Sequence, residues 1–178
     1  TAALSSNSGG NTNWTFSSPT SSQIKFVKWN AAGNNDGSSW TNAWTSLRNG
    51  ANSATTGDEV WVAGTNTYAE NVTMKGGVAI YGGFAGTESA RTSRAITTNP
   101  VTVDPNAVDG IVGAAGCTID GFYVTGAVDG IDNNTATATI ANNIIYSCTS
   151  DGIELNASAV SNSLYSNTIY SAAVRGIL

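Results

Sequence analysis

The sequence predicts an all-β solenoid, in which the chain winds in coils of about 20–24 residues and each coil lies on the last. The main observation is a recurring triplet. Asp-Gly-Ile stands at 109–111, 129–131 and 151–153, and Arg-Gly-Ile follows at 175–177. The steps are 20, 22 and 24 residues (109 to 129, 129 to 151, 151 to 175). Short β-branched runs bounded by Gly, Asn, Asp and Pro support the same fold class.

Composition narrows the function classes. The chain has 178 residues, which suits one domain, and 12 acidic residues against 7 basic ones give a net charge of -5. An acidic chain without a basic stripe is not expected to bind nucleic acid. Because there is no histidine, Ser/His and Cys/His nucleophilic pairs are excluded and zinc is not supported. No apolar run reaches the roughly 20 residues of a membrane span.

An extracellular or cell-surface location is expected from composition. The chain begins at Thr1 rather than Met, which is typical of removal of an export signal. Asn-X-Ser/Thr sequences mark candidate glycosylation sites at Asn13, Asn71, Asn133 and Asn156.

Three segments follow one another along the chain. Residues 1–23 are polar apart from Leu4, Trp14 and Phe16, and are expected to be flexible or ordered by a partner. Residues 24–58 are expected to form a terminal cap, with a strand at 24–29 and a short helix at 43–54 capped by Thr41 or Asn42. Residues 59–178 are the coils. All five tryptophans lie in the first third of the chain, which favours a bulky cap over a distributed binding surface.

The later coils align residue by residue. Three interior columns are predicted: Ile119, Ile140 and Leu164; Val124, Ile145 and Ile169; and the isoleucines of the triplets with Ile177. Gly121 and Asn142 mark a bend with positive φ, and Asn143 over Asn167 predicts an amide ladder. Cys117 and Cys148 stand in different columns, so two buried thiols and an inter-coil disulfide both remain open.

Three segments of the first half resemble a known family. They are Asp-Gly-Ser-Ser-Trp-Thr-Asn-Ala-Trp at 36–44, Gly-Asp-Glu-Val-Trp-Val-Ala at 57–63 and Ile-Tyr-Gly-Gly-Phe-Ala-Gly-Thr-Glu at 80–88. They are similar to the amino-terminal capping region of right-handed parallel β-helix proteins, the pectate-lyase-like superfamily, and above all its surface and adhesin-like members. The resemblance covers residues 24–178 and implies the fold. It does not fix a function, because this scaffold hosts lyases, hydrolases, adhesins and structural fibres.

Four carboxylates are the candidate metal site. Strand alternation predicts that Asp132 and Glu154 point outward on adjacent coils, beside a column of Asp129 and Asp151. Turn-forming and solvated carboxylates, a calcium site and a catalytic carboxylate pair are the three alternatives.

The resemblance implies further that a lyase would pair calcium ligands with a Lys or Arg base. Arg175 alone lies in a neighbouring coil, and an ion pair with Asp151 is the expected role for it. The Gly-His-Gly of the related hydrolases is missing. We therefore expect no catalytic residues and no required cofactor, with calcium as the one candidate ion.

Tyr146 and Tyr170 are expected to stack on the outside, either as a ledge for polysaccharide or for stability alone.

The predicted self-assembly surface combines both ends of the chain. Leu164, Ile169, Val174, Ile177 and Leu178 are expected at an uncapped C-terminal coil, and Leu4, Trp14 and Phe16 of the tail could reach a neighbouring molecule. The predicted function is a non-catalytic extracellular structural or adhesive protein whose copies assemble head-to-tail into a filament. Two alternatives are a polysaccharide-binding or calcium-dependent lyase-like module, and the N-terminal fragment of a large surface adhesin.

Overall fold

The computed structural model describes residues 22–135, 137–155 and 161–178, and the fifteen strands in these ranges belong to three parallel sheets. Sheet A has the order β1 (Ile24–Val27), β2 (Glu59–Ala63), β5 (Ala79–Phe84), β8 (Thr118–Asp120), β11 (Thr139–Ala141) and β14 (Ser163–Tyr165). Sheet B runs through β3 (Asn66–Tyr68), β6 (Val101–Val103), β9 (Phe122–Thr125), β12 (Ile144–Tyr146) and β15 (Thr168–Tyr170). Sheet C consists of β4 (Val72–Thr73), β7 (Ile111–Val112), β10 (Ile131–Asn133) and β13 (Ile153–Leu155).

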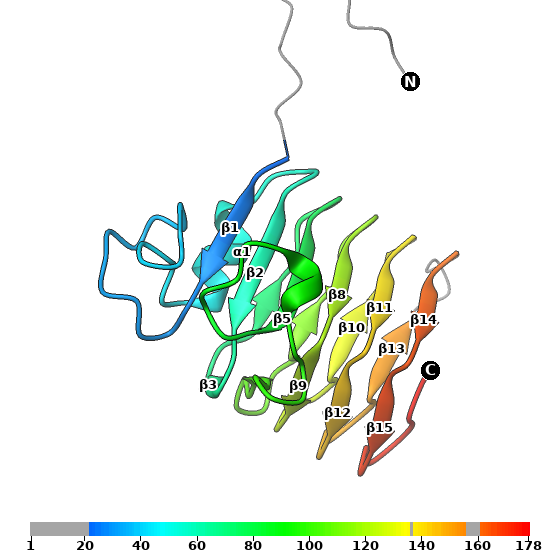
Figure 1. Ribbon diagram of the computed structural model, residues 1–178. Helices are drawn as coiled ribbons and strands as arrows, with labels where there is room; N and C mark the ends of the chain where they lie inside the picture. Colours follow the sequence, from blue (N-terminus) through cyan, green and yellow to red (C-terminus); the bar gives the residue numbers. More distant parts are fainter. Residues whose placement is uncertain (1–21, 136, 156–160) are drawn as a thin grey trace, which may run out of the picture.

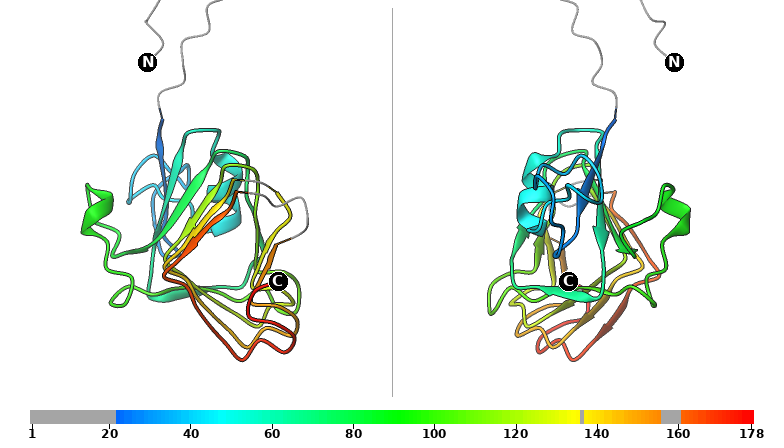
Figure 2. Two further views of the ribbon diagram at one scale, coloured as in Figure 1. Left: turned by 90° about the vertical axis from the view of Figure 1, so that its right-hand side faces the viewer. Right: turned by 60° about the vertical axis from the view of Figure 1, so that its left-hand side comes forward.

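From β2 onward the chain visits sheets A, B and C in turn, so each circuit adds one strand to each sheet. Figure 1 shows the strands of successive circuits side by side, and the views in Figure 2 show the circuits overlying one another around a common axis. This arrangement is compatible with a parallel β-helix. The predicted register is confirmed, because Ile131 pairs with Ile111 on one side and with Ile153 on the other.

The recurring triplet has a physical reason at each position. Its isoleucines are fully buried and form one column of the core. Its glycines allow a close approach of neighbouring coils: a Cβ added at Gly130 would lie 2.3 Å from Cγ2 of Ile145 and 2.6 Å from the carbonyl oxygen of Gly152. A side chain there would push two coils apart, so only glycine keeps the strand spacing of about 4.8 Å.

The corner between sheets A and B carries the predicted amide ladder. Asn143 is completely buried, and its Oδ1 accepts the N–H of Phe122 at 3.0 Å. Its Nδ2 donates to the carbonyl oxygen of Ile119 and to Oδ1 of Asn167, each at 3.1 Å. The bend before the ladder has the predicted positive φ, 87° at Gly121 and 56° at Asn142. The ladder therefore satisfies backbone groups that the turn removes from the sheets.

One helix, α1 (Leu47–Ser53), lies against the first strands of the solenoid at the N-terminal end (Figure 1). It begins four residues later than the sequence predicted, and Thr41 and Asn42 are not its caps. The reason is that Trp44 exchanges two backbone hydrogen bonds with the edge of β1, to Phe26 and from Lys28, and so stays extended.

Side chains on both sides of β4 hold the helix in place. The N-cap is Ser46, whose Oγ accepts the N–H of Asn49 at 3.1 Å. The carboxylate of Glu70 accepts the N–H groups of Leu47 and Arg48, while the ammonium group of Lys75 donates to the carbonyl oxygen of Ala54. An anion at the N-terminus and a cation at the C-terminus of a helix both complement its dipole.

Aromatic residues join this cap to the outer face of sheet A. The rings of Trp61 and Phe84 stack with centroids 4.7 Å apart, and Phe26 and Trp40 pack edge-on at the same distance. The indole N–H of Trp40 donates to the carbonyl oxygen of Glu88, whose own carboxylate accepts three successive backbone N–H groups. The motif at residues 80–88 is therefore a folded anchor for the cap loop.

Cys117 and Cys148 are buried and free, so they form no disulfide with each other. Within the described ranges no helix has the length and apolar character needed to cross a membrane.

Replacing Asn143 by alanine tests the ladder. The Asn143→Ala variant leaves the N–H of Phe122 and the carbonyl oxygen of Ile119 buried without this partner, so we expect a loss of about 2–4 kcal/mol in the free energy of unfolding. Urea denaturation followed by circular dichroism measures it. Asn52→Ala, at an exposed helix position, is the control and should change stability by less than about 0.5 kcal/mol. Equal effects of the two substitutions would contradict the ladder.

Candidate functional site

The aspartates of the triplets form a ladder rather than an outward acidic column. Oδ1 of Asp109 accepts the N–H of Asp129 at 3.3 Å, and Oδ1 of Asp129 accepts the N–H of Asp151 at 2.8 Å. Asp151, only 2% exposed, ends the ladder in a two-pronged ion pair with Arg175 at 3.0–3.1 Å. Asp129 and Asp151 stack on adjacent coils as predicted, but they do not join Asp132 and Glu154 on an open acidic face. Both are buried because they lie at a corner, where strand alternation does not apply.

The ion pair between Asp151 and Arg175 was predicted and is confirmed. It raises the pKa of Arg175, chiefly through the hydrogen bond to Asp151. The carboxylates of this column therefore satisfy backbone N–H groups and one guanidinium group.

Asp132 and Glu154 do lie opposite each other on β10 and β13, as predicted, and both are half-buried. Burial raises the pKa of Asp132, and the carboxylates of Asp109 and Asp129 raise it further. Burial also raises the pKa of Glu154, and the nearby carboxylates raise it further: Asp129, Asp132, Asp151 and Asp109. Oδ1 of Asp132 is enclosed and has no hydrogen-bond partner. Within the acidic cluster, Asp132 and Glu154 are the residues whose ionised forms lower the stability of the fold.

Over residues 22–135, 137–155 and 161–178, no three His, Cys, Asp or Glu side chains are grouped so that they could hold a metal ion. The calcium site at Asp129, Asp132, Asp151 and Glu154 stays a prediction.

Tyr146 and Tyr170 stack as predicted, with ring centroids 5.2 Å apart and planes 6° from parallel. The two rings belong to paired positions on β12 and β15, so their facing surfaces cover each other. A sugar ring that packs on an aromatic face would thus find the outer face of Tyr170, which is half exposed, rather than a two-ring ledge.

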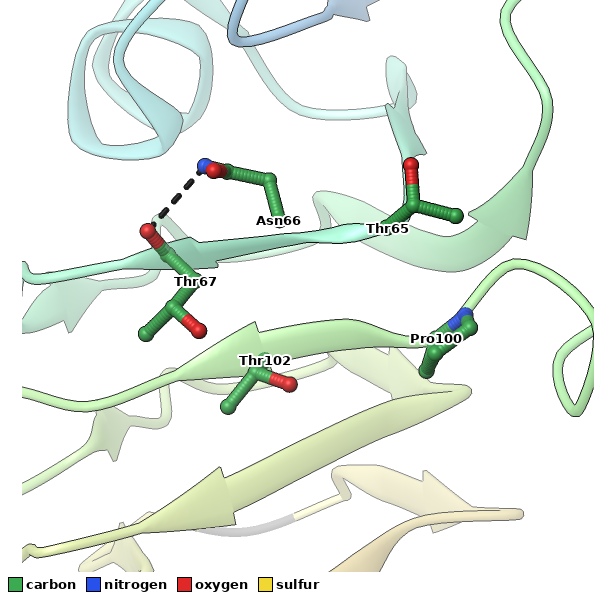
Figure 3. Close-up of a pocket in the computed structure, with 5 residues that line it drawn as sticks. All are labelled: Thr65, Asn66, Thr67, Pro100 and Thr102. Atoms are coloured by element: carbon green, nitrogen blue, oxygen red, sulfur yellow. Dashed lines mark hydrogen bonds between the residues drawn. The ribbon is translucent and has the colours of Figure 1, made fainter.

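A shallow polar depression on sheet B was not predicted. Figure 3 shows its lining, Thr65, Asn66, Thr67, Pro100 and Thr102, and its volume is about 520 Å³. Thr67 and Thr102 are paired on β3 and β6, and Tyr123 occupies the next position of the same outward column. The lining has hydroxyl and amide groups but no charge. The alternation of Thr67 and Thr102 with buried residues was a signal in the sequence that these two side chains face outward. The shape of the depression depends on turns, which residue spacing does not reveal.

The C-terminal coil exposes part of the predicted assembly surface. Val174 is 61% exposed, Ile177 52% and Leu178 42%, whereas Leu164 and Ile169 are half-buried because they continue interior columns. Leu4, Trp14 and Phe16 lie outside the described residues. On the far side of β14 and β15 the described chain offers no further strand, although Ile177 bridges Ile153 in sheet C.

The glycosylation candidates differ in accessibility. Asn133 is completely buried, and its Nδ2 donates to the carbonyl oxygen of Thr135 and to Oδ1 of Asn162, so in the folded chain it cannot carry a glycan. Asn71 is half-buried and its Oδ1 accepts from Arg48. Asn13 and Asn156 lie outside the described residues.

Comparison with family models, curated proteins and solved structures finds no match for this chain. The class that the structure defines is a mostly β protein with three stacked parallel sheets and a single helix, within the part of the chain that it describes.

Asp132→Asn tests the electrostatic cost of the outward pair. A carboxyl group with a raised pKa in the folded state stabilises the fold at acid pH and loses that contribution as the pH rises from 3.8 through the folded pKa. We therefore expect the variant to be more stable than the wild type at pH 7 by about 0.2–1 kcal/mol, with the difference vanishing near pH 3. Thermal unfolding across this pH range measures it.

The matched control is Asp36→Asn. Hydrogen bonds from Ser38 lower the pKa of Asp36, so its contribution is present above the unfolded pKa and is lost in acid. This variant should lose stability at pH 7. If the wild type were more stable than the Asp132→Asn variant at pH 7, the account would be contradicted.

Proposed function

We propose that the chain is a right-handed parallel β-helix of the pectate-lyase-like superfamily, close to its surface and adhesin-like members, and that it is an extracellular structural or adhesive protein without catalytic activity. The observation that carries the proposal is that the repeated polar residues of the coils bond to neighbouring coils rather than to an open site. The N-terminal end is covered by α1 and the loop that hydrogen-bonds to β1, and Val174, Ile177 and Leu178 are exposed on the last described coil.

The bonding of the acidic residues supports a structural role. A catalytic carboxylate needs access to substrate and a pKa suited to its task. Asp109 and Asp129 instead accept backbone N–H groups of the following coil, and Asp151 is neutralised by Arg175. These contacts give the repeated aspartates a structural role.

The free cysteines are in keeping with an oxidising exterior. Burial raises the pKa of the Cys117 thiol, and burial with the carboxylate of Asp129 raises that of Cys148 to about 11. Little thiolate forms at neutral pH, so both thiols resist oxidation although they are unpaired.

Head-to-tail assembly is part of this proposal. Contact between the open coil of one copy and the capped end of the next uses two different surfaces, and such a contact does not close on itself. A contact of this kind would extend into a filament. Backbone edges and an apolar surface together are the usual basis for adding a strand to a sheet.

A polysaccharide-binding module is the second candidate, favoured by the uncharged depression beside Thr102 and Tyr123. Hydroxyl and amide groups next to one aromatic ring suit a neutral sugar better than an acidic one. Titration calorimetry with neutral oligosaccharides that detects no heat of binding would remove this candidate.

Assembly is tested by placing a charge on the open coil. We expect the wild-type chain to form polymers that sediment and appear as filaments by electron microscopy. Ile177→Lys, at a half-exposed position of that coil, should raise the concentration needed for assembly at least about tenfold, because an ammonium group cannot be buried unpaired at a joint. Val108→Lys, at an exposed apolar position away from this coil, is the control. A wild-type chain that stays monomeric at millimolar concentration would contradict the proposal.

A further inference from the structure

The outer face of sheet B differs in charge from the outer faces of the other two sheets. On sheet A two carboxylates form ion pairs with arginines of the segment 85–99, and on sheet C two carboxylates lie opposite each other. Within the described residues, the outward positions of sheet B carry only Thr, Tyr and Ile side chains, and all of them are at least partly exposed. In a chain of net charge -5, this face therefore matches a partner without charge.

The depression on this face presents hydrogen-bonding groups that the fold does not use. Thr65, Thr67 and Thr102 each carry a hydroxyl, which can donate and accept, and none of the three hydroxyls has a partner among the described residues. Asn66 donates through Nδ2 to the carbonyl oxygen of Thr67 at 3.0 Å, which leaves its Oδ1 free to accept (Figure 3). By contrast, the hydroxyl of Ser46 beside α1 is bonded to a carboxylate of the chain. The depression thus offers both donors and acceptors to a ligand rich in hydroxyl groups.

Tyr123 extends the depression toward the next coil. It pairs with Thr102 across β6 and β9, in the outward column that begins at Thr67. Its ring is half-buried, and no ring of another described residue stacks on it, whereas the ring of Tyr146 is covered by the following coil. Two strand spacings, about 10 Å, separate β3 from β9. A ligand that fills the depression and also reaches this ring is therefore longer than one sugar unit.

We infer that the outer face of sheet B binds a neutral polysaccharide strand, which runs along the solenoid axis with its hydroxyls on Thr65, Thr67 and Thr102 and with the C–H face of one sugar ring on Tyr123. A hexopyranose with equatorial hydroxyls has an apolar face and a polar rim, and this suits an aromatic ring beside hydroxyl side chains. The inference rests on the polysaccharide-binding candidate named above, and it assigns that candidate a face, a set of residues and a ligand class.

Two other classes of partner fit this face less well. An acidic polysaccharide needs cations, and the described outward positions of sheet B provide none. A peptide that adds as a strand needs free backbone groups at a sheet edge. The backbone groups of β6 and β9 are instead engaged in ladders with strands on both sides, so this face presents side chains alone.

Binding is tested with the full chain and three neutral oligosaccharides, cellohexaose, chitohexaose and mannohexaose. We expect titration calorimetry to give a dissociation constant of about 1 mM or tighter for at least one of them. Hexagalacturonate, an acidic counterpart, should bind at least about tenfold more weakly, because its carboxylates find no cation and the chain is acidic. Chemical-shift changes of backbone amides on addition of the neutral ligand should map to β3, β6 and β9.

Substitutions with matched controls identify the residues. Tyr123→Ala should weaken binding of the neutral ligand about tenfold through loss of the ring, and Thr102→Val about threefold through loss of one hydroxyl. Tyr165→Ala and Thr139→Val change the same residue types on the outer face of sheet A and should leave binding unchanged. Circular dichroism checks the fold of each variant, and the chemical-shift map of the wild type locates the ligand whether or not a variant folds.

The outcomes separate this inference from the proposed function. If no neutral oligosaccharide binds, both the inference and the polysaccharide-binding candidate are overturned, while the structural role is untouched. If one binds but its shifts map to sheet A or sheet C, the inference alone falls. Equal or tighter binding of hexagalacturonate overturns the neutral ligand. Shifts on sheet B that depend on protein concentration without any sugar mean that a second copy covers this face, and this result also overturns the inference.

Discussion

The close approach of neighbouring coils at the Asp-Gly-Ile corner is the constraint on which the rest of the structure depends. Glycine at the middle position lets the carbonyl oxygen of one coil come near the backbone of the next, and any Cβ there would collide with it. The aspartate on one side then reaches the N–H of the following coil, and the isoleucine on the other side joins the core. Sheet register follows from this corner, because a shift of one residue would turn every side chain to the opposite face.

Buried polar residues in this solenoid replace the hydrogen bonds that turns remove from sheets. The Asp ladder does so at the corner before sheet C, and the Asn ladder does so between sheets A and B. Such ladders are directional: each rung requires a partner from the next coil.

The register, the interior columns, the stacked tyrosines and the pair Asp151–Arg175 could be predicted because residues at equal positions in successive coils lie on one another. The burial of Asp129 and Asp151 could not, since alternation inside and outside holds in strands and fails at corners. The burial of Asn133 was available from that same alternation, as it lies two positions after the buried Ile131. The start of α1 depends on Glu70, a partner 24 residues from the N-cap, and local sequence does not reveal it.

The stacking of coils in register is tested most directly by a disulfide. Asp132→Cys with Glu154→Cys places two thiols at paired positions of β10 and β13, where neighbouring strands lie at a spacing that a disulfide spans. Oxidation should link them within one chain, as detected by mass spectrometry of the digested protein. Asp132→Cys with Leu155→Cys, one residue out of register and on opposite faces, should stay reduced. Efficient linkage of the second pair and none of the first would contradict the solenoid described here.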